Sequence, residues 1–168
     1  MIACVDVDYR VSQAVAACVL FRSWSDAVSA DEKIALITEV DPYVPGHFYR
    51  RELPCLLAVL AQVCDPIDVI VIDGYVWLRD EQAPGLGARL YQALSRSIPV
   101  IGVAKNCFRG VVAAAAVRRG TSQQPLYVTA VGMDLKLAAK HIQSMHGKHR
   151  IPTLLKRVDR LCREYRCS

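Results

Sequence analysis

The sequence predicts an α/β protein whose mixed central sheet is flanked by helices. Three strand-like stretches, residues 2–9, 11–21 and 34–40, follow one another with no helix between them, which predicts an antiparallel three-strand meander. Two further apolar stretches, residues 68–73 and 98–104, each come after a helical pattern, which predicts strands parallel to the first. At 168 residues, the chain is expected to form a single domain over residues 1–168.

The helices are predicted from apolar residues at helical spacing and from their start signals. Glu52 and Pro54 are expected to open the first helix, because proline is tolerated in a first turn. The remaining elements are a helix at residues 86–95, strands at 110–117 and 126–132, and two helices that begin after Asp134 and at Pro152.

Composition excludes several classes of protein. The hydrophobic fraction is 53%, but no apolar run reaches the length of about 18 to 20 residues that spans a membrane. The first strand follows Met1 directly, with no signal peptide before it. Seven cysteines without a CxxC pair predict reduced thiols and a cytoplasmic location.

The net charge of +5 is concentrated near the end of the chain. Across residues 136–166, Lys and Arg clearly outnumber the acids Asp159 and Glu164. On charge alone this region could equally be a solvated helix face. A basic region attached to an acidic centre, however, favours a nucleic-acid partner.

That acidic centre is predicted where two strands carry aspartates. Asp6 and Asp8 point to the same face of the first strand, since side chains alternate along a strand. A buried carboxylate is costly unless it is compensated, so Asp6 is either hydrogen-bonded locally or part of a cation site. Asp73 ends a second buried strand, expected beside the first. Two such strands favour a metal-dependent phosphoryl-transfer site.

The role of each of three other candidate residues can be interpreted in two ways. Glu52 at a helix N-terminus would be stabilised by the helix dipole, which competes with a catalytic role. Lys105 follows a buried strand on the same sheet edge as the aspartates, where it reaches a phosphate or is an ordinary exposed lysine. Tyr43 lies in a stiff loop between Pro42 and Pro45, as a wedge against stacked bases or as an aromatic folded onto the core.

Six blocks of the sequence occur in a familiar order: Val5-Asp6-Val7; Pro42-Tyr43-Val44-Pro45-Gly46 with Arg51-Glu52; Asp73-Gly74; Ile98-Pro99-Val100-Ile101-Gly102-Val103-Ala104-Lys105; Val131-Gly132-Met133; and His149-Arg150-Ile151-Pro152. Together they resemble the endonuclease V family over nearly the whole chain. The proline-bracketed tyrosine, at its distance from the Arg-Glu pair, is the most specific block.

The resemblance implies a ribonuclease H-like fold and a bound Mg²⁺, with Mn²⁺ as a substitute. It implies four acidic metal ligands, which are Asp6, Glu52, Asp73 and Asp159. The implied catalytic residues are Asp6, Glu52, Asp73 and, near the scissile phosphate, Lys105. The implied nucleic-acid contacts are the wedge Tyr43 together with Pro42, Pro45, Gly46, His149 and Arg150.

The activity implied by the resemblance is DNA repair. The resemblance implies that the chain nicks DNA, or RNA as an alternative substrate, at the second phosphodiester 3′ to hypoxanthine, leaving 3′-hydroxyl and 5′-phosphate ends. The lesion base is expected to be extruded into a pocket, and a monomer is favoured.

The chain departs from the family pattern in three places. It begins at the first strand, without the usual N-terminal helical segment. Residues 75–78 replace a small, glycine-containing step near the expected base pocket, and residues 153–156 differ where the family has a Glu-Pro-Thr-Arg type run. Two alternatives therefore stay open, a nucleic-acid-binding relative that does not cut and a nuclease of the same fold with another specificity.

Overall fold

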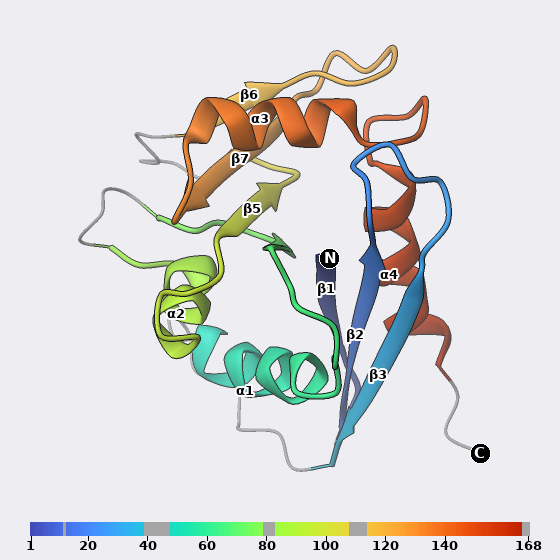
Figure 1. Cartoon of the computed structure of the whole chain (residues 1–168), viewed down its shortest axis with the longest axis vertical. Helices are drawn as coiled ribbons and strands as arrows, with labels where there is room; N and C mark the ends of the chain where they lie inside the picture. Colours follow the sequence, from blue (N-terminus) through green and yellow to red (C-terminus); the bar gives the residue numbers. More distant parts are fainter. Residues whose placement is uncertain (12, 39–47, 79–82, 108–113, 166–168) are drawn as a thin grey trace.

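The computed structural model describes residues 1–11, 13–38, 48–78, 83–107 and 114–165. Within them, seven strands form one mixed sheet in the order β3-β2-β1-β4-β5-β7-β6 (Figure 1). The strands are β1 (Ile2–Tyr9), β2 (Ala14–Phe21), β3 (Asp31–Ile37), β4 (Val69–Asp73), β5 (Val100–Ala104), β6 (Ala115–Val117) and β7 (Leu126–Val131). The helices are α1 (Phe48–Leu60), α2 (Leu86–Ala93), α3 (Leu135–Ser144) and α4 (Thr153–Glu164).

The first three strands form the expected antiparallel meander. Between the end of β1 and the start of β2, the Arg10 amide donates to the Gln13 carbonyl at 2.8 Å. The third strand begins at Asp31 rather than at residue 34, so the prediction of its start was wrong. Its first residues are polar because β3 is the outermost strand, where one side of the backbone faces no further strand.

Parallel pairing brings three strand ends to one edge of the sheet. Val5 on β1 is opposite Ile72 on β4, and Ile72 is opposite Gly102 on β5. Asp6 and Asp73 therefore emerge side by side, as the crossover rule predicted. Lys105 follows β5 at the same edge.

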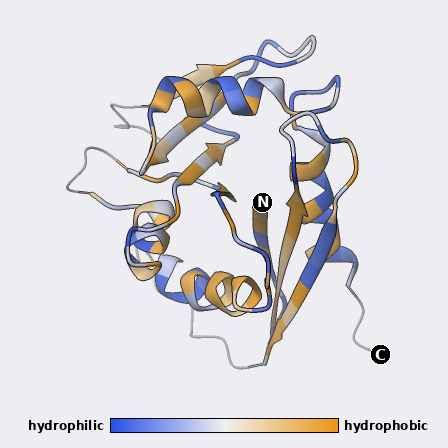
Figure 2. Ribbon diagram, viewed as in Figure 1, coloured by the Kyte–Doolittle hydropathy of each residue, from blue (hydrophilic) through white to orange (hydrophobic). Residues whose placement is uncertain are grey.

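Helices cover both faces of the sheet, as Figure 1 shows. α1 packs on β1 and β2 and α2 on β5, while α4 packs on β1 and β2 from the opposite face and α3 on β6 and β7. The two apolar cores lie between these layers, and β2, buried at every residue, is hydrophobic along its length in Figure 2. None of the helices in the described ranges is long and apolar enough to cross a bilayer.

The start of α1 differs from the prediction. The helix begins at Phe48, so Glu52 lies in its second turn and Pro54 in its interior. Proline removes one helical hydrogen bond, but Leu56 and Val59 are almost fully buried against the sheet. This burial compensates for the missing bond, which propensity alone did not predict.

Candidate active site

Five carboxylates line one cavity at the carboxyl ends of β1 and β4; one is Asp8 of β1, and the other four come from separate parts of the chain. Asp6 and Asp73 come from the sheet, Glu52 comes from α1 on one face, and Asp159 comes from α4 on the other. The cavity has a volume of about 250 Å³ and is open to solvent. Four residues that are far apart in the sequence are therefore brought together, and all four are acids predicted from it.

Burial and mutual repulsion raise the pKa values of two of these acids. Burial, followed by the charge of Asp73, raises the pKa of Asp6 to about 6, although the Val7 amide donates to its Oδ1 at 2.9 Å. Burial, followed by the charges of Asp6 and Asp73, raises the pKa of Glu52 to about 8. Glu52 is 7% exposed and is not at a helix terminus, so the predicted dipole stabilisation was wrong.

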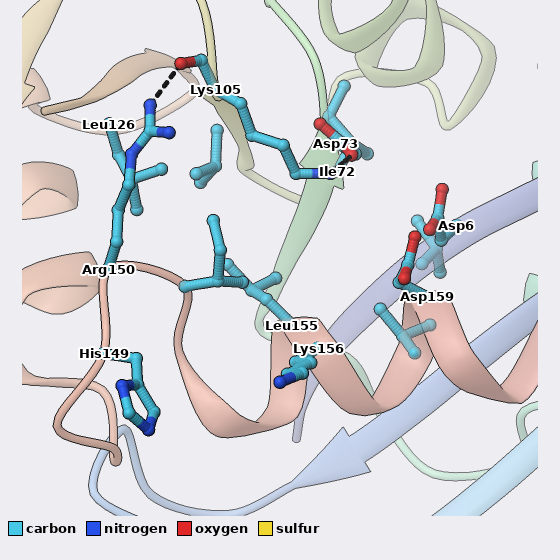
Figure 3. Close-up of a pocket in the computed structure, with 14 residues that line it drawn as sticks. Asp6, Ile72, Asp73, Lys105, Leu126, His149, Arg150, Leu155, Lys156 and Asp159 are labelled. Atoms are coloured by element: carbon cyan, nitrogen blue, oxygen red, sulfur yellow. Dashed lines mark hydrogen bonds and ion pairs between the residues drawn. The ribbon is translucent and has the colours of Figure 1, made fainter. Parts of the chain in front are cut away.

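Lys105 supplies a positive charge at this cluster. Its Nζ donates to Asp73 Oδ2 at 2.6 Å, and Figure 3 shows its side chain extended toward that carboxylate. Burial lowers the pKa of Lys105, but the hydrogen bond and the neighbouring aspartates outweigh this and raise it above its ordinary value. Lys105 is therefore not an isolated surface lysine.

The chemistry of the four acids suits a divalent cation. Hard cations such as Mg²⁺ prefer carboxylate oxygens, and the repulsion that raises the pKa values of Asp6 and Glu52 is what a cation relieves. In the described part of the chain, no three His, Cys, Asp or Glu side chains converge on one point as a ready metal site. The carboxylates are therefore not arranged as a preformed metal site, and one oxygen of Asp73 is engaged by Lys105.

Arg119, which the sequence did not single out, holds the segment beside this site. It is 6% exposed, and its guanidinium donates hydrogen bonds to five main-chain carbonyls at the end of α3 and beyond. These carbonyls belong to Gln143 (3.4 Å), Met145, Gly147 (3.1 Å), His149 (3.1 Å) and Arg150 (3.4 Å). A buried arginine far from any predicted acid gave no signal of this role in the sequence.

We expect Arg119→Lys to lower the free energy of unfolding by about 2 kcal/mol, because an ammonium cannot serve five spread carbonyls and leaves buried acceptors unsatisfied. Urea unfolding measures this change. The exposed neighbour provides a matched control, Arg118→Lys, for which we expect a change below about 0.5 kcal/mol. Equal stability of the two variants would contradict the structural role of Arg119.

Arg150 and His149 were predicted to contact nucleic acid. The Arg150 guanidinium donates to the carbonyls of Lys105 and Pro125, the latter at 2.8 Å, and the Lys105 contact is drawn in Figure 3. Arg150 thus ties its segment to the backbone of Lys105, while His149 is exposed beside it. The predicted contacts Pro42, Tyr43, Pro45 and Gly46 lie outside the described residues.

Three further cavities border Asp73, and two of them lie on opposite faces of the sheet. One, of about 480 Å³, lies toward α1 and α2 and is lined by Tyr49, Tyr75, Leu78, Leu86 and Arg89 among others. The Arg89 guanidinium stacks on the Tyr49 ring, with 3.4 Å between its central carbon and the ring centroid. The other, of about 320 Å³, lies toward α4 (Figure 3). The acids therefore stand between two hollows on opposite faces of the sheet.

The segment 75–78, where the chain departs from the family pattern, is fixed against the sheet. The Val76 amide donates to Thr129 Oγ1 at 2.9 Å, and the Trp77 indole donates to the Ala130 carbonyl at 3.3 Å. Gly102 permits this approach, since a Cβ there would lie 2.6 Å from the Gly74 carbonyl oxygen. One wall of the larger cavity is therefore set by this segment.

Comparison with known proteins gives the family. A family model described as Endonuclease V matches residues 1–114. The Endonuclease V of Streptomyces avermitilis is 33% identical over 183 residues, in an alignment that covers 95% of this chain and 77% of that protein. The chain belongs to the endonuclease V family. The resemblance found in the sequence is thereby confirmed.

Solved structures of this family agree with the fold. The crystal structure of the Streptomyces avermitilis enzyme has a TM-score of 0.77 and 30% identity, and covers 97% of this chain and 79% of that one. Endonuclease V of Ciona intestinalis, solved with a 24mer DNA containing an inosine followed by a ribo-adenosine, has a TM-score of 0.82 and 20% identity, and covers 97% and 84%. The ribonuclease H-like fold of the family is therefore confirmed for this chain.

Proposed function

We propose that this endonuclease V family member is a Mg²⁺-dependent endonuclease that nicks hypoxanthine-containing DNA. The cut is placed at the second phosphodiester 3′ to the lesion, leaving 3′-hydroxyl and 5′-phosphate ends. The observation that carries the proposal is the cavity bordered by Asp6, Glu52, Asp73 and Asp159, with Lys105 at the same edge. The Ciona relative solved with inosine-containing DNA supports the choice of lesion.

In the proposed mechanism, the acids hold the metal and Lys105 contacts the substrate. When bound, a divalent cation supplies an activated water and stabilises charge on the leaving 3′ oxygen. Asp6, Glu52, Asp73 and Asp159 would hold it through carboxylate oxygens. The Lys105 ammonium, released from Asp73, is then free to donate to a non-bridging oxygen of the scissile phosphate.

The cavity toward α1 and α2 is the proposed site for the extruded base. Its volume of about 480 Å³ and its Tyr75, Leu78 and Leu86 side chains suit a flat heterocycle that leaves the stack. A damaged base that pairs weakly costs less to extrude, which favours hypoxanthine over a normal base.

Matched oligonucleotides with and without inosine, as DNA and as RNA, test the proposal. With Mg²⁺ we expect one nick, placed two phosphodiesters 3′ of the inosine, and with EDTA none. The length and end groups of the product are read on a denaturing gel after phosphatase and ligase treatment. Binding without a cut in any condition would overturn the assignment as an enzyme and leave the binding alternative.

A nuclease of the same fold with another specificity is the second candidate. The observation that favours it is the segment 75–78, which places Tyr75 and Leu78 in the larger cavity where the family pattern has small residues. The same experiment separates the two, since Mg²⁺-dependent cutting that ignores inosine would support this candidate.

A further inference from the structure

The cavity of about 320 Å³ toward α4 is separate from the proposed base pocket. Its walls are apolar and come from the strand ends, the segment before α4 and α4 itself: Ile72, Val103, Leu126, Ile151, Leu155 and Val158. Figure 3 looks into this hollow, with Leu126 and Leu155 on opposite sides of it. A partly open apolar hollow of this size lies within the range of small-ligand sites.

The polar rim of this cavity carries both acidic and basic side chains. Asp6, Asp73 and Asp159 border it where it meets the acid cluster, and Lys105 lies there too, paired with Asp73. Arg150 and the exposed Lys156 add positive charge to the rim. Any occupant therefore lies within reach of the metal-holding acids and beside cationic groups, which suits a nucleotide with its phosphates at the rim.

The geometry points to a second nucleotide site. We propose that this cavity binds the base of the nucleotide directly 3′ of the scissile phosphate, the first nucleotide of the 5′-phosphate product. This inference rests on the proposed function. In the proposed function, the scissile phosphate lies at the acids and the lesion base lies in the cavity toward α1 and α2. The DNA strand must therefore leave the acids on the other side. Both cavities border Asp73, so the DNA strand would be held on both sides of the scissile phosphate.

Leu155 and Ile151 are the walls through which the site can be tested. Both are half-buried, so a larger side chain there extends into the hollow. Leu155→Trp fills the cavity from α4, and Ile151→Phe, in the segment before α4, replaces it if the first variant does not fold. The matched control is Leu137→Trp, because Leu137 is 46% exposed on α3 and borders neither cavity.

The first measurement uses inosine-containing DNA with 2-aminopurine at the nucleotide 3′ of the scissile phosphate, with Ca²⁺ in place of Mg²⁺ to slow cutting. The fluorescence of this base rises when it leaves the DNA stack. We expect a rise on binding to the wild-type protein and to Leu137→Trp, and none with Leu155→Trp. A 2-aminopurine placed three nucleotides further 3′ should not respond.

The second measurement removes the base. An abasic residue at the same position should weaken binding to the wild-type protein about tenfold, the scale of one base–side-chain contact, and weaken binding to Leu155→Trp by less than about twofold. If inosine-containing DNA is cut but the fluorescence and the abasic penalty match those of the distal position, the second site is overturned and the proposed function stands. If such DNA is neither bound nor cut, both are overturned.

Discussion

Replacing Asp73 by Asn is expected to lower Mg²⁺-dependent cutting by about a thousandfold while the fold is kept. A bound metal contributes several kcal/mol of charge stabilisation in the transition state, and each 1.4 kcal/mol corresponds to about a factor of ten in rate. Asp73 ends β4 at the acid cavity and is the carboxylate that Lys105 contacts at 2.6 Å. Its loss therefore removes a proposed metal ligand and the carboxylate that pairs with Lys105. Single-turnover cleavage of an inosine-containing strand measures the effect.

The matched control for this variant precedes the same strand. Asp68 pairs with the Met1 amino group at 2.7 Å, is 77% exposed, and lies at the opposite edge of the sheet from the acids. We expect Asp68→Asn to cut at a rate within about twofold of the wild-type rate, because an exposed ion pair contributes little. Undiminished Mg²⁺-dependent cutting by Asp73→Asn would reject the metal assignment.

Replacing Glu52 by Gln is expected to abolish cutting and to stabilise the metal-free protein at alkaline pH. The folded pKa of Glu52 is raised from 4.5 to about 8 by burial and by Asp6 and Asp73. Between these two pH values the folded state binds more protons than the unfolded state, so the free energy of unfolding falls as pH rises. Glutamine has no such dependence. We expect the variant to be more stable by about 4 to 5 kcal/mol at pH 8.5, and equally stable well below pH 4.5.

Urea unfolding in EDTA at several pH values measures this difference. The exposed Glu164 at the end of α4 provides the control, Glu164→Gln, for which we expect a pH dependence like that of the wild type. With Mg²⁺ present the advantage of Glu52→Gln should shrink, since the metal binds only the wild-type site well. A Glu52→Gln variant that is less stable than the wild type at pH 8.5 would contradict the burial and repulsion described for this acid.

Residues that depend on local pattern were predictable, and those that depend on distant contacts were not. Asp6 and Asp73 could be placed because a period of two and a parallel crossover fix both the face and the edge of their strands. The start of α1 was wrong because burial against the sheet, and not the propensity near Pro54, sets it. Arg119 was missed because its partners lie 24 to 31 residues later in the chain.

The site was predictable in composition but not in electrostatics. The family pattern implied which acids meet, and the structure brings them to one cavity. The raised pKa of Glu52 depends on its depth between α1 and the sheet, which no short stretch of sequence encodes. The same holds for the inward-facing Arg150, whose partners Lys105 and Pro125 become neighbours only in the folded chain.

The polar outer strand has a consequence for how copies of the protein meet. β3 is the outermost strand of the meander, and its charges are engaged: Lys33 pairs with Asp31 at 2.8 Å, and Glu32 accepts two hydrogen bonds from Arg157 of α4, at 2.8 and 2.6 Å. A strand from a second copy could join here only by burying these ions. These charges at the β3 edge of the sheet therefore disfavour the strand-by-strand aggregation that an apolar edge strand would allow.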